Sequence, residues 1–274
     1  MNSKYNRGQA GISQEERHII DTMVHSGKLI VRSIDLEQTL GYSTEKANLA
    51  LSRLCKKGWL QRLRSGIYRV VPLGSDSANP IPEDAWAIAM ELFSPCYISG
   101  WTAAEHWELT EQIFNSTVIF SGQKQRKKDH LIAGLTYRAK FIALKNIWGT
   151  KSIWSSNKKI LIADIHRTII DVLDDPKLGG GGRHTIDILK TYLQKKEADL
   201  EILMQYAKKL EHGSVFKRLG FIIEKFANPS STWVETLHSK IKTGIINLDP
   251  NGPNSGPIIT KWGIRINIPL GDIA

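Results

Sequence analysis

Residues 33–72 restrict the possible fold more than any other part of the sequence. This segment predicts a short helix, a tight turn, a second and more basic helix, and then a β-hairpin. Gly41 ends the first of these helices, because glycine adopts the left-handed conformation common at a helix C-terminus. Ser43 or Thr44 can cap the second helix through a side-chain hydroxyl. This order is typical of a helix-turn-helix.

The second helix, expected over residues 43–57, has two distinct faces. Apolar residues at helical spacing predict one buried stripe, made of Ala47, Ala50, Leu51 and Leu54. The opposite face carries Lys46, Asn48, Leu49, Ser52, Arg53 and Lys56. Leu49 could touch a thymine methyl group from this face. We favour packing on the first helix instead, because apolar side chains are more often buried than in contact with a ligand.

Two β-type runs follow this helix, and Gly58 separates them from it. Residues 59–63 and 67–71 flank residues 64–66, which we expect to form the tip of a hairpin. A helical pattern over residues 14–25 supplies a further helix at the start of the segment. Together these elements predict a winged helix-turn-helix that reads DNA. A small winged domain used only for protein contact is the alternative interpretation.

The predicted DNA contacts follow from the shape of the duplex. A helix about 10–12 Å across fits the major groove, where each base pair presents its own pattern of donors and acceptors. The candidates for base reading are Lys46, Asn48, Ser52 and Arg53. Phosphate contacts add affinity without requiring a particular base. The candidates for phosphate contact, at the helix end and on the wing, are Lys56, Lys57, Arg62 and Arg64.

The net charge of +10 is concentrated in the winged segment. Residues 1–72 contain 12 Lys and Arg against 6 Asp and Glu, whereas residues 73–274 contain 25 against 21. A concentrated positive field attracts a polyanion and accelerates encounter with it. The charge distribution therefore favours a nucleic acid as the partner.

Cysteine use and hydropathy indicate a reduced, aqueous compartment. Cys55 and Cys96 have no partner at metal-ligand spacing, so we interpret both as plain thiols. The chain does not open on a signal-peptide pattern and has no apolar run of about 18 residues. We expect a cytoplasmic protein with no membrane role.

Composition divides the chain into three parts. We predict a winged domain over residues 1–72, a linker rich in proline, glycine and serine over residues 73–83, and a larger domain over residues 84–274. In the larger domain the predicted helices are 84–93, 102–109, 164–173, 186–196, 200–210 and 215–226, and the predicted strands are 117–120, 135–144, 147–154, 159–163 and 261–268. Strands that mostly precede helices favour an α+β (mixed α/β) fold.

Four segments of the larger domain resemble those of a known family. They are SGWTAAEHWEL (99–109), ILIADIHRTIIDVLDDPKLGGGGR (160–183), SVFKRLGFIIE (214–224) and KWGIRIN (261–267). Their order and spacing, with the leading winged segment and the linker, resemble the AbiEi family of antitoxins. Those proteins are transcriptional regulators of type IV toxin–antitoxin pairs from bacterial abortive-infection systems, which act in phage defence.

The resemblance implies a repressor that binds inverted repeats in double-stranded operator DNA, as two monomers or as a dimer, and so regulates its own operon. It also implies that the C-terminal domain neutralises a neighbouring nucleotidyltransferase-like toxin without forming a stable complex. A second domain with a degenerate nucleotidyltransferase-like fold is a further expectation. No cofactor is implied.

The acidic residues of the larger domain do not match a catalytic pattern. Nucleotidyl transfer needs two or three carboxylates that converge on magnesium. The candidates are Asp129, Asp164, Asp171, Asp174 and Asp175. Asp164 is better interpreted as a helix cap, and Asp174 and Asp175 as a turn before proline, so we expect no catalytic residue and no metal site. The alternative is an enzyme, a nuclease or nucleotidyltransferase that the winged domain brings to nucleic acid.

Two predicted helices carry a candidate antitoxin surface. The resemblance at HRTIIDVL makes Arg167, Thr168 and Asp171 candidates, although Arg167 and Asp171 also have the spacing of an i,i+4 ion pair. Lys217 and Arg218 lie beside the apolar stripe of the helix over residues 215–226. A solvated basic face is one interpretation of this pair, and contact with RNA, DNA or the toxin is the other.

Four consecutive glycines occupy residues 179–182 and precede Arg183 and His184. Glycines can cradle a phosphate, since they allow backbone amides to approach an anion. No Lys-Ser or Lys-Thr pair follows to complete a P-loop. We therefore interpret the glycines as a flexible connection.

Overall fold

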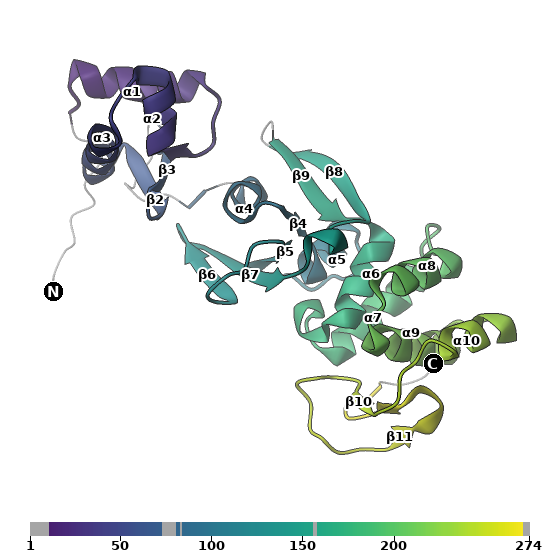
Figure 1. Cartoon of the computed structure of the whole chain (residues 1–274). Coiled ribbons are helices and arrows are strands. Elements are labelled where there is room, and N and C mark those ends of the chain that lie inside the picture. Colours follow the sequence, from purple (N-terminus) through teal and green to yellow (C-terminus); the bar gives the residue numbers. More distant parts are fainter. Residues whose placement is uncertain (1–10, 73–80, 83, 156–157, 271–274) are drawn as a thin grey trace. The chain divides into compact units, whose positions relative to one another are not determined.

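The computed structural model describes residues 11–72, 81–82, 84–155 and 158–270. Residue contacts group the chain into two compact units, Met1–Leu92 with Asp129–Tyr137, and Phe93–Lys128 with Arg138–Ala274. Figure 1 shows the elements of each unit. Most of the predicted linker, residues 73–80 and 83, lies outside the described residues, so the linker stays a prediction.

The winged part of the first unit begins with three helices, α1 (Gln14–His25), α2 (Ser33–Leu40) and α3 (Thr44–Lys56). Strands β1 (Val31–Arg32), β2 (Leu60–Arg64) and β3 (Ile67–Val70) form an antiparallel sheet in the order β1-β3-β2. This arrangement is consistent with the predicted winged helix-turn-helix. Strand β1 was not predicted, because two residues are too few to show an alternating pattern.

Local caps determine where these helices start and stop. Ser13 and Glu16 bond each other's backbone amides through their side chains, which forms a capping box at the start of α1. Gly41, with φ at 64°, ends α2 in the left-handed region as predicted. Ser43 Oγ accepts a hydrogen bond from the Lys46 amide at 3.2 Å and caps α3. Ser43 rather than Thr44 is therefore the cap.

The predicted stripe of α3 forms the core of the winged part. Ala47, Leu51 and Leu54 are fully buried, whereas Ala50 is half-buried at the edge. They pack in one cluster with α1 and α2, through Ile19 and Leu36 among others. Burial of each leucine or isoleucine side chain in this cluster contributes roughly 1.5–3 kcal/mol. Helix α3 is thus held by its apolar face, and its polar face is left to solvent.

A mixed sheet follows, in the order β6-β7-β5-β4-β9-β8. Its strands are β4 (Cys96–Ile98), β5 (Ser116–Ser121), β6 (Asp129–Ile132), β7 (Leu135–Phe141), β8 (Thr150–Ser155) and β9 (Lys158–Ala163). Strand β4 pairs antiparallel with β5 and parallel with β9, and β8 pairs antiparallel with β9. The fold is therefore mixed α+β, as predicted, although β4 and β6 were missed.

The helices after the winged part are α4 (Ala85–Phe93), α5 (Gly100–His106), α6 (Ile165–Asp174), α7 (Gly182–Leu193), α8 (Leu200–Leu210), α9 (Gly213–Phe226) and α10 (Ser231–His238). Helix α6 contacts α5, α7, α8 and α9, which places it at the centre of this group. Helix α10 was not predicted. Among the described residues, none of the helices combines the length and the apolar character needed to cross a membrane.

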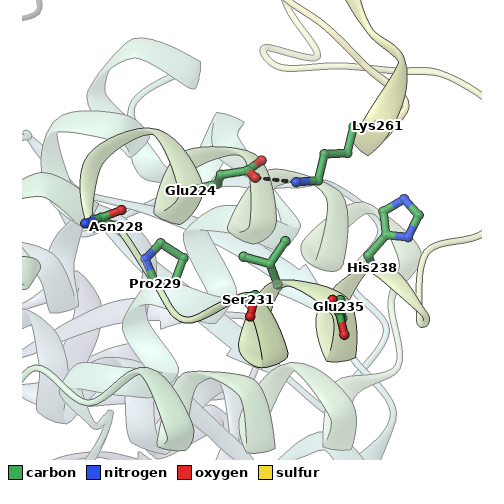
Figure 2. Close-up of a pocket in the computed structure, with 8 residues that line it drawn as sticks. Glu224, Asn228, Pro229, Ser231, Glu235, His238 and Lys261 are labelled. Carbon is green, nitrogen blue, oxygen red and sulfur yellow. Dashed lines mark hydrogen bonds and ion pairs between the residues drawn. The ribbon is translucent and has the colours of Figure 1, made fainter.

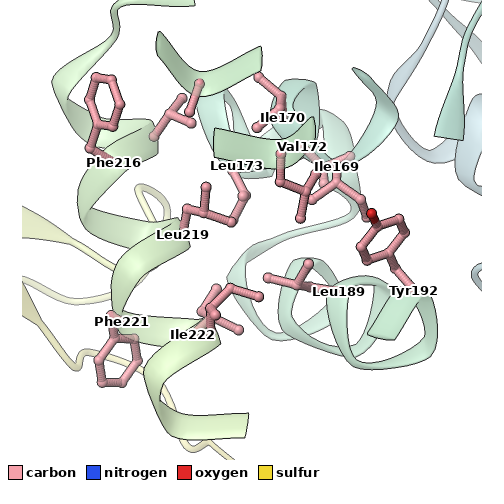
Figure 3. Packing of buried hydrophobic residues seen from close by; sticks show 14 of the residues in the cluster. Ile169, Ile170, Val172, Leu173, Leu189, Tyr192, Phe216, Leu219, Phe221 and Ile222 are labelled. Carbon is pink, nitrogen blue, oxygen red and sulfur yellow. The ribbon is translucent and has the colours of Figure 1, made fainter. Parts of the chain in front are cut away.

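The core of the second unit lies around α6. Figure 3 shows Ile169, Val172 and Leu173 of α6 between Leu189 of α7 and Leu219 of α9. All five side chains are fully buried. Because buried side chains surround α6 on nearly every side, its polar residues are enclosed as well, and this determines the environment of Arg167 and Asp171.

The end of the chain differs from the sequence prediction. The alternating run over residues 261–268 predicted one strand, but the structure has a short 3-10 turn, Thr260–Trp262, followed by β12 (Ile264–Arg265). Strand β12 lies between β10 (Ile246–Asn247) and β11 (Ile258–Ile259) in a small sheet. Trp262 is fully buried and enters the core, so packing rather than strand pairing determines this segment.

The glycine run is not a flexible connection, and that prediction is wrong. Gly179 ends a 3-10 turn, Gly180 has φ at 87°, and Gly182 begins α7. A Cβ atom at Gly180 would lie 2.6 Å from the ring of His184, and His184 Nδ1 is 2.6 Å from the Gly179 carbonyl oxygen. The glycines are needed because the backbone turns tightly against neighbouring groups.

Candidate nucleic-acid interface

The exposed face of α3 carries three of the predicted base-reading residues, Asn48, Ser52 and Arg53, together with Lys56, a predicted phosphate contact. Asn48, Arg53 and Lys56 are exposed and Ser52 is half-buried, at positions i, i+5, i+8 and i+4 of the helix respectively. Leu49 is 52% exposed on the same face, so the prediction that it packs on the first helix is wrong. Its exposure fits the other interpretation, contact with a thymine methyl group.

Arg53 and Lys56 differ from the other basic candidates in having no hydrogen-bond or ion-pair partner among the described residues. Arg53 helps to lower the pKa of the nearby Glu15 carboxylate, but neither charge is held by a direct contact, so both can bind an external anion. Asn48 and Ser52 lie beside them on the helix and offer neutral donors and acceptors. This combination of neutral and charged groups is suited to base edges flanked by phosphates.

Lys46 is engaged at the start of the same helix. Its ammonium lies 2.9 Å from the Glu15 carboxylate and 3.9 Å from the centre of the Tyr42 ring. Tyr42 donates a hydrogen bond to Glu15 at 2.7 Å, and this bond, with those from Lys46, lowers the pKa of Glu15. The hydrogen bond to Glu15 also raises the pKa of Lys46. These contacts join α3 to α1. Lys46 could contact a base only after breaking its ion pair with Glu15.

Lys57 has a similar structural partner at the other end of α3. Its ammonium lies 2.6 Å from Glu16, the residue of the α1 capping box. The hydrogen bond from Lys57 lowers the pKa of Glu16. The sequence could not show this pairing, because the two residues are 41 positions apart. Lys57 therefore joins α1 and α3, while its half-buried side chain keeps some solvent contact.

The two arginines of the wing have different environments. Arg62 is exposed, and its guanidinium donates to the Arg64 carbonyl at 3.3 Å and to Ser65 Oγ at 3.1 Å. Arg64 is half-buried and donates to the Leu92 carbonyl at 3.2 Å, and burial lowers its pKa. Arg62 is thus presented at the hairpin tip, and Arg64 is held within its own unit.

The candidate antitoxin residues are all buried and do not form an exposed surface, so that part of the prediction is wrong. Arg167, Thr168 and Asp171 are at most 1% exposed, and Lys217 and Arg218 are 3% and 5% exposed. The i,i+4 pair itself is confirmed, with Arg167 Nε 2.8 Å from Asp171 Oδ1. The apolar side chains that surround α6 and α9 explain why these polar groups are enclosed.

The enclosed pair belongs to a larger polar cluster. Asp171 accepts hydrogen bonds from Tyr97 at 3.0 Å and from Ser99 at 2.7 Å, and the Tyr97 hydroxyl accepts one from Arg167 at 3.0 Å. Burial raises the pKa of Asp171, and the neighbouring Arg167 acts in the opposite direction. The Arg167 guanidinium also stacks 3.9 Å from the centre of the Trp148 ring. These contacts give the cluster a structural role in joining α6 to the sheet.

Lys217 and Arg218 attach the C-terminal segment to α9. Arg218 donates to the carbonyls of Leu173, Asn247 and Leu248 at 2.8–3.2 Å, and burial lowers its pKa to about 10. Lys217 donates to the Gly244 carbonyl at 2.5 Å. A solvated basic face was the favoured interpretation, and it is wrong, because these charges are used to satisfy buried carbonyl groups.

The carboxylates tested for catalysis are occupied by other partners. Asp164 caps α6 through the Arg167 amide at 2.7 Å, as predicted, and accepts a hydrogen bond from Tyr206 at 2.7 Å. Asp174 contacts Lys140 and His212, and Asp175 lies 3.5 Å from Lys140. The described residues contain no group of three or more His, Cys, Asp or Glu side chains placed to hold a metal ion.

A hollow of about 480 Å³ lies between α9 and α10. Figure 2 shows its lining, in which Glu224 and Lys261 form an ion pair above Ser231 and Glu235. Glu224 also accepts a hydrogen bond from the Trp262 indole at 2.7 Å. Glu224 and Lys261 therefore bind one another and anchor the C-terminal segment to α9.

Comparison with known proteins supports the regulator resemblance at the winged part. Residues 18–71 match the sequence model of a family described as transcriptional regulator, AbiEi antitoxin. The curated proteins contain no match to the chain. Among solved structures, the chain is similar to the crystal structure of the RV2827C protein from Mycobacterium tuberculosis, with a TM-score of 0.63 and 13% sequence identity. That likeness covers 94% of this chain and 93% of the other, and it concerns the fold alone.

Proposed function

We propose, from the AbiEi-type regulator domain at residues 18–71, that this protein is a sequence-specific DNA-binding repressor and antitoxin. The exposed stripe of α3 carries the proposal. It combines Asn48 and Ser52 with two charges, Arg53 and Lys56, that form no hydrogen bond or ion pair among the described residues. A helix with this face can enter the major groove while its apolar face stays in the core.

The proposed DNA target is an inverted repeat in the operator of the protein's own gene. Two copies of the winged part, from two monomers or a dimer, would each place α3 in one half-site. Arg62 at the hairpin tip would contact the backbone or the minor groove beside it. The spacing between half-sites would then follow from the protein's geometry, and binding there would repress transcription.

The proposed antitoxin activity belongs to the second domain. It would neutralise a nucleotidyltransferase-like toxin of a type IV abortive-infection pair without a stable complex, in the cytoplasm. The engaged carboxylates Asp164, Asp171 and Asp174 favour a regulator over an enzyme, because each already has hydrogen-bond or ion-pair partners within the fold. Copurification of this protein with the neighbouring gene product would count against the absence of a stable complex.

Two single substitutions on α3 test the proposal. Arg53→Ala should weaken operator binding by roughly 1–3 kcal/mol and relax the base preference at one position, if Arg53 reads a guanine. Lys56→Ala should weaken binding to all sequences alike and reduce the salt slope by about one. Affinities for the upstream DNA, its single-base variants and a random duplex provide the measurement. Equal losses on operator and random DNA for Arg53→Ala would contradict the base-reading role.

A further inference from the structure

Five consecutive residues between β5 and β6 contain four basic side chains, with Gln125 as the one interruption. We call residues 124–128 the basic loop; its charged members are Lys124, Arg126, Lys127 and Lys128. All four are exposed. The loop belongs to the second unit and is not among the predicted DNA contacts.

The four charges are not compensated within the described structure. None of them has a carboxylate partner there. Lys124 contacts an aromatic ring. The Lys124 ammonium lies 5.7 Å from the centre of the Phe141 ring, which is 48% exposed. Like charges placed this close repel one another, so the loop has an unfavourable electrostatic energy until an anion neutralises it.

The backbone on either side of the basic loop is nevertheless fixed. The Gln123 amide donates to Ser121 Oγ at 3.0 Å at one end, and the Ala139 amide donates to the Lys128 carbonyl at 2.8 Å at the other. Ser121 Oγ in turn donates to the Phe93 carbonyl at 2.7 Å. The charged side chains therefore project from an anchored loop, which reduces the entropy lost on binding.

We propose that the basic loop is a second phosphate-binding element, which contacts a DNA backbone. A phosphate backbone presents closely and regularly spaced negative charges, and it suits four adjacent cations better than the scattered carboxylates of a protein surface. The inference rests on the proposed function for the identity of the DNA. The basic loop would add affinity without adding base preference, since phosphates carry no sequence information.

The test is a full-length variant in which Lys124, Arg126, Lys127 and Lys128 are all replaced by Gln. Dissociation constants for upstream DNA and a random duplex are measured over a range of salt concentrations. Each phosphate that the variant no longer neutralises reduces the slope of log K against log salt by about 0.9. We expect the slope to fall by about two to four on both DNAs, with the ratio of their affinities unchanged.

A matched control removes the same charge without touching the loop. Lys177, Lys196, Lys225 and Lys242 are exposed and dispersed over the second unit, and their replacement by Gln should change the slope by less than one. A circular dichroism melt verifies that both variants fold. An unchanged slope for the loop variant, or an equal change in the control, would overturn the inference.

Two further results distinguish phosphate binding by the loop from sequence-specific binding by the winged part, and from binding of an acidic protein by the loop. If the wild-type protein binds upstream and random DNA equally, the proposed function fails, while a lower slope for the loop variant still supports phosphate binding by the loop. If the wild-type protein binds polyglutamate more tightly than DNA and the loop variant loses only that binding, the loop recognises carboxylates and the inference is overturned.

Discussion

The pair Arg167–Asp171 is enclosed on all sides, and its energetics differ from those of an exposed pair with the same spacing. Each ion removed from water incurs a desolvation cost of several kcal/mol, which the mutual attraction and the added hydrogen bonds must offset. Asp171 receives bonds from Tyr97 and Ser99 in addition to Arg167. Removal of one partner would leave a buried charge that the remaining donors cannot neutralise.

Arg167→Met should therefore reduce the free energy of unfolding by about 3–5 kcal/mol. The matched control is Arg183→Met, because Arg183 forms an i,i+4 pair with Asp187 in which both side chains are nearly half exposed. An exposed pair contributes at most about 1 kcal/mol. Urea unfolding of the two variants measures the difference. Similar small losses in both would show that the buried pair is not a stabilising element of the fold.

Asp174 and His212 form a second residue pair whose protonation depends on pH. Burial acts to raise the pKa of Asp174, but hydrogen bonds from His212 and Lys140 outweigh it and hold the pKa at about 2. Since the unfolded value is about 3.9, this carboxylate stabilises the fold by roughly 2 kcal/mol above pH 4 and loses that effect as pH falls towards 2. The hydrogen bond to Asp174 raises the pKa of His212, whose contribution is lost as pH rises through that value.

Asp174→Asn should lower the pKa of His212, because the carboxylate that stabilises the imidazolium is removed. Titration of the His212 ring resonances by NMR gives this pKa directly. Asp175→Asn is the control, since Asp175 contacts Lys140 at 3.5 Å but not His212. If His212 titrated at the same pH in the wild type and in Asp174→Asn, the pair would not be coupled in solution.

At the scale of elements, the sequence predicted where helices begin and end, because these points are set by residues close together in the chain. Ser43, Gly41 and Asp164 cap or end their helices as the sequence indicated, because each acts on backbone groups within a few residues. Periodicity placed Leu49 on the exposed face of α3, and the packing preferred for it was wrong because an apolar side chain need not be buried. The burial of Arg218 depends on carbonyl groups far along the chain, so periodicity could not reveal it. In the candidate site, the residue types were predictable, but the engagement of Lys46 and Lys57 by α1 was not.

Gly220 illustrates a constraint of this non-local kind between α9 and the C-terminal segment. A Cβ atom there would lie 2.1 Å from the Trp262 ring. Gly220→Ala should therefore displace Trp262 and destabilise the protein by about 1–3 kcal/mol, despite the better helix propensity of alanine. The control is Gly213→Ala in the same helix, where the nearest atoms are 3.9 Å away. Thermal melts of both variants provide the test, and equal melting temperatures would contradict the packing argument.

At the scale of the whole molecule, the two units divide the proposed tasks. The winged part holds 12 Lys and Arg against 6 Asp and Glu, which concentrates positive charge where DNA reading is proposed. The second unit encloses the polar residues of α6 and α9 and exposes instead the basic loop at residues 124–128. In the proposed function, the charge of the winged part serves sequence-specific DNA binding and not a general affinity for polyanions.

A salt titration of full-length protein binding to its own upstream DNA, beside a random duplex of equal length, distinguishes sequence-specific binding from general affinity for polyanions. We expect a steep salt dependence for both duplexes and a preference of at least about a thousandfold for the upstream site. Equal affinity for the two duplexes at every salt concentration would contradict this expectation. The winged part would then be a general nucleic-acid tether.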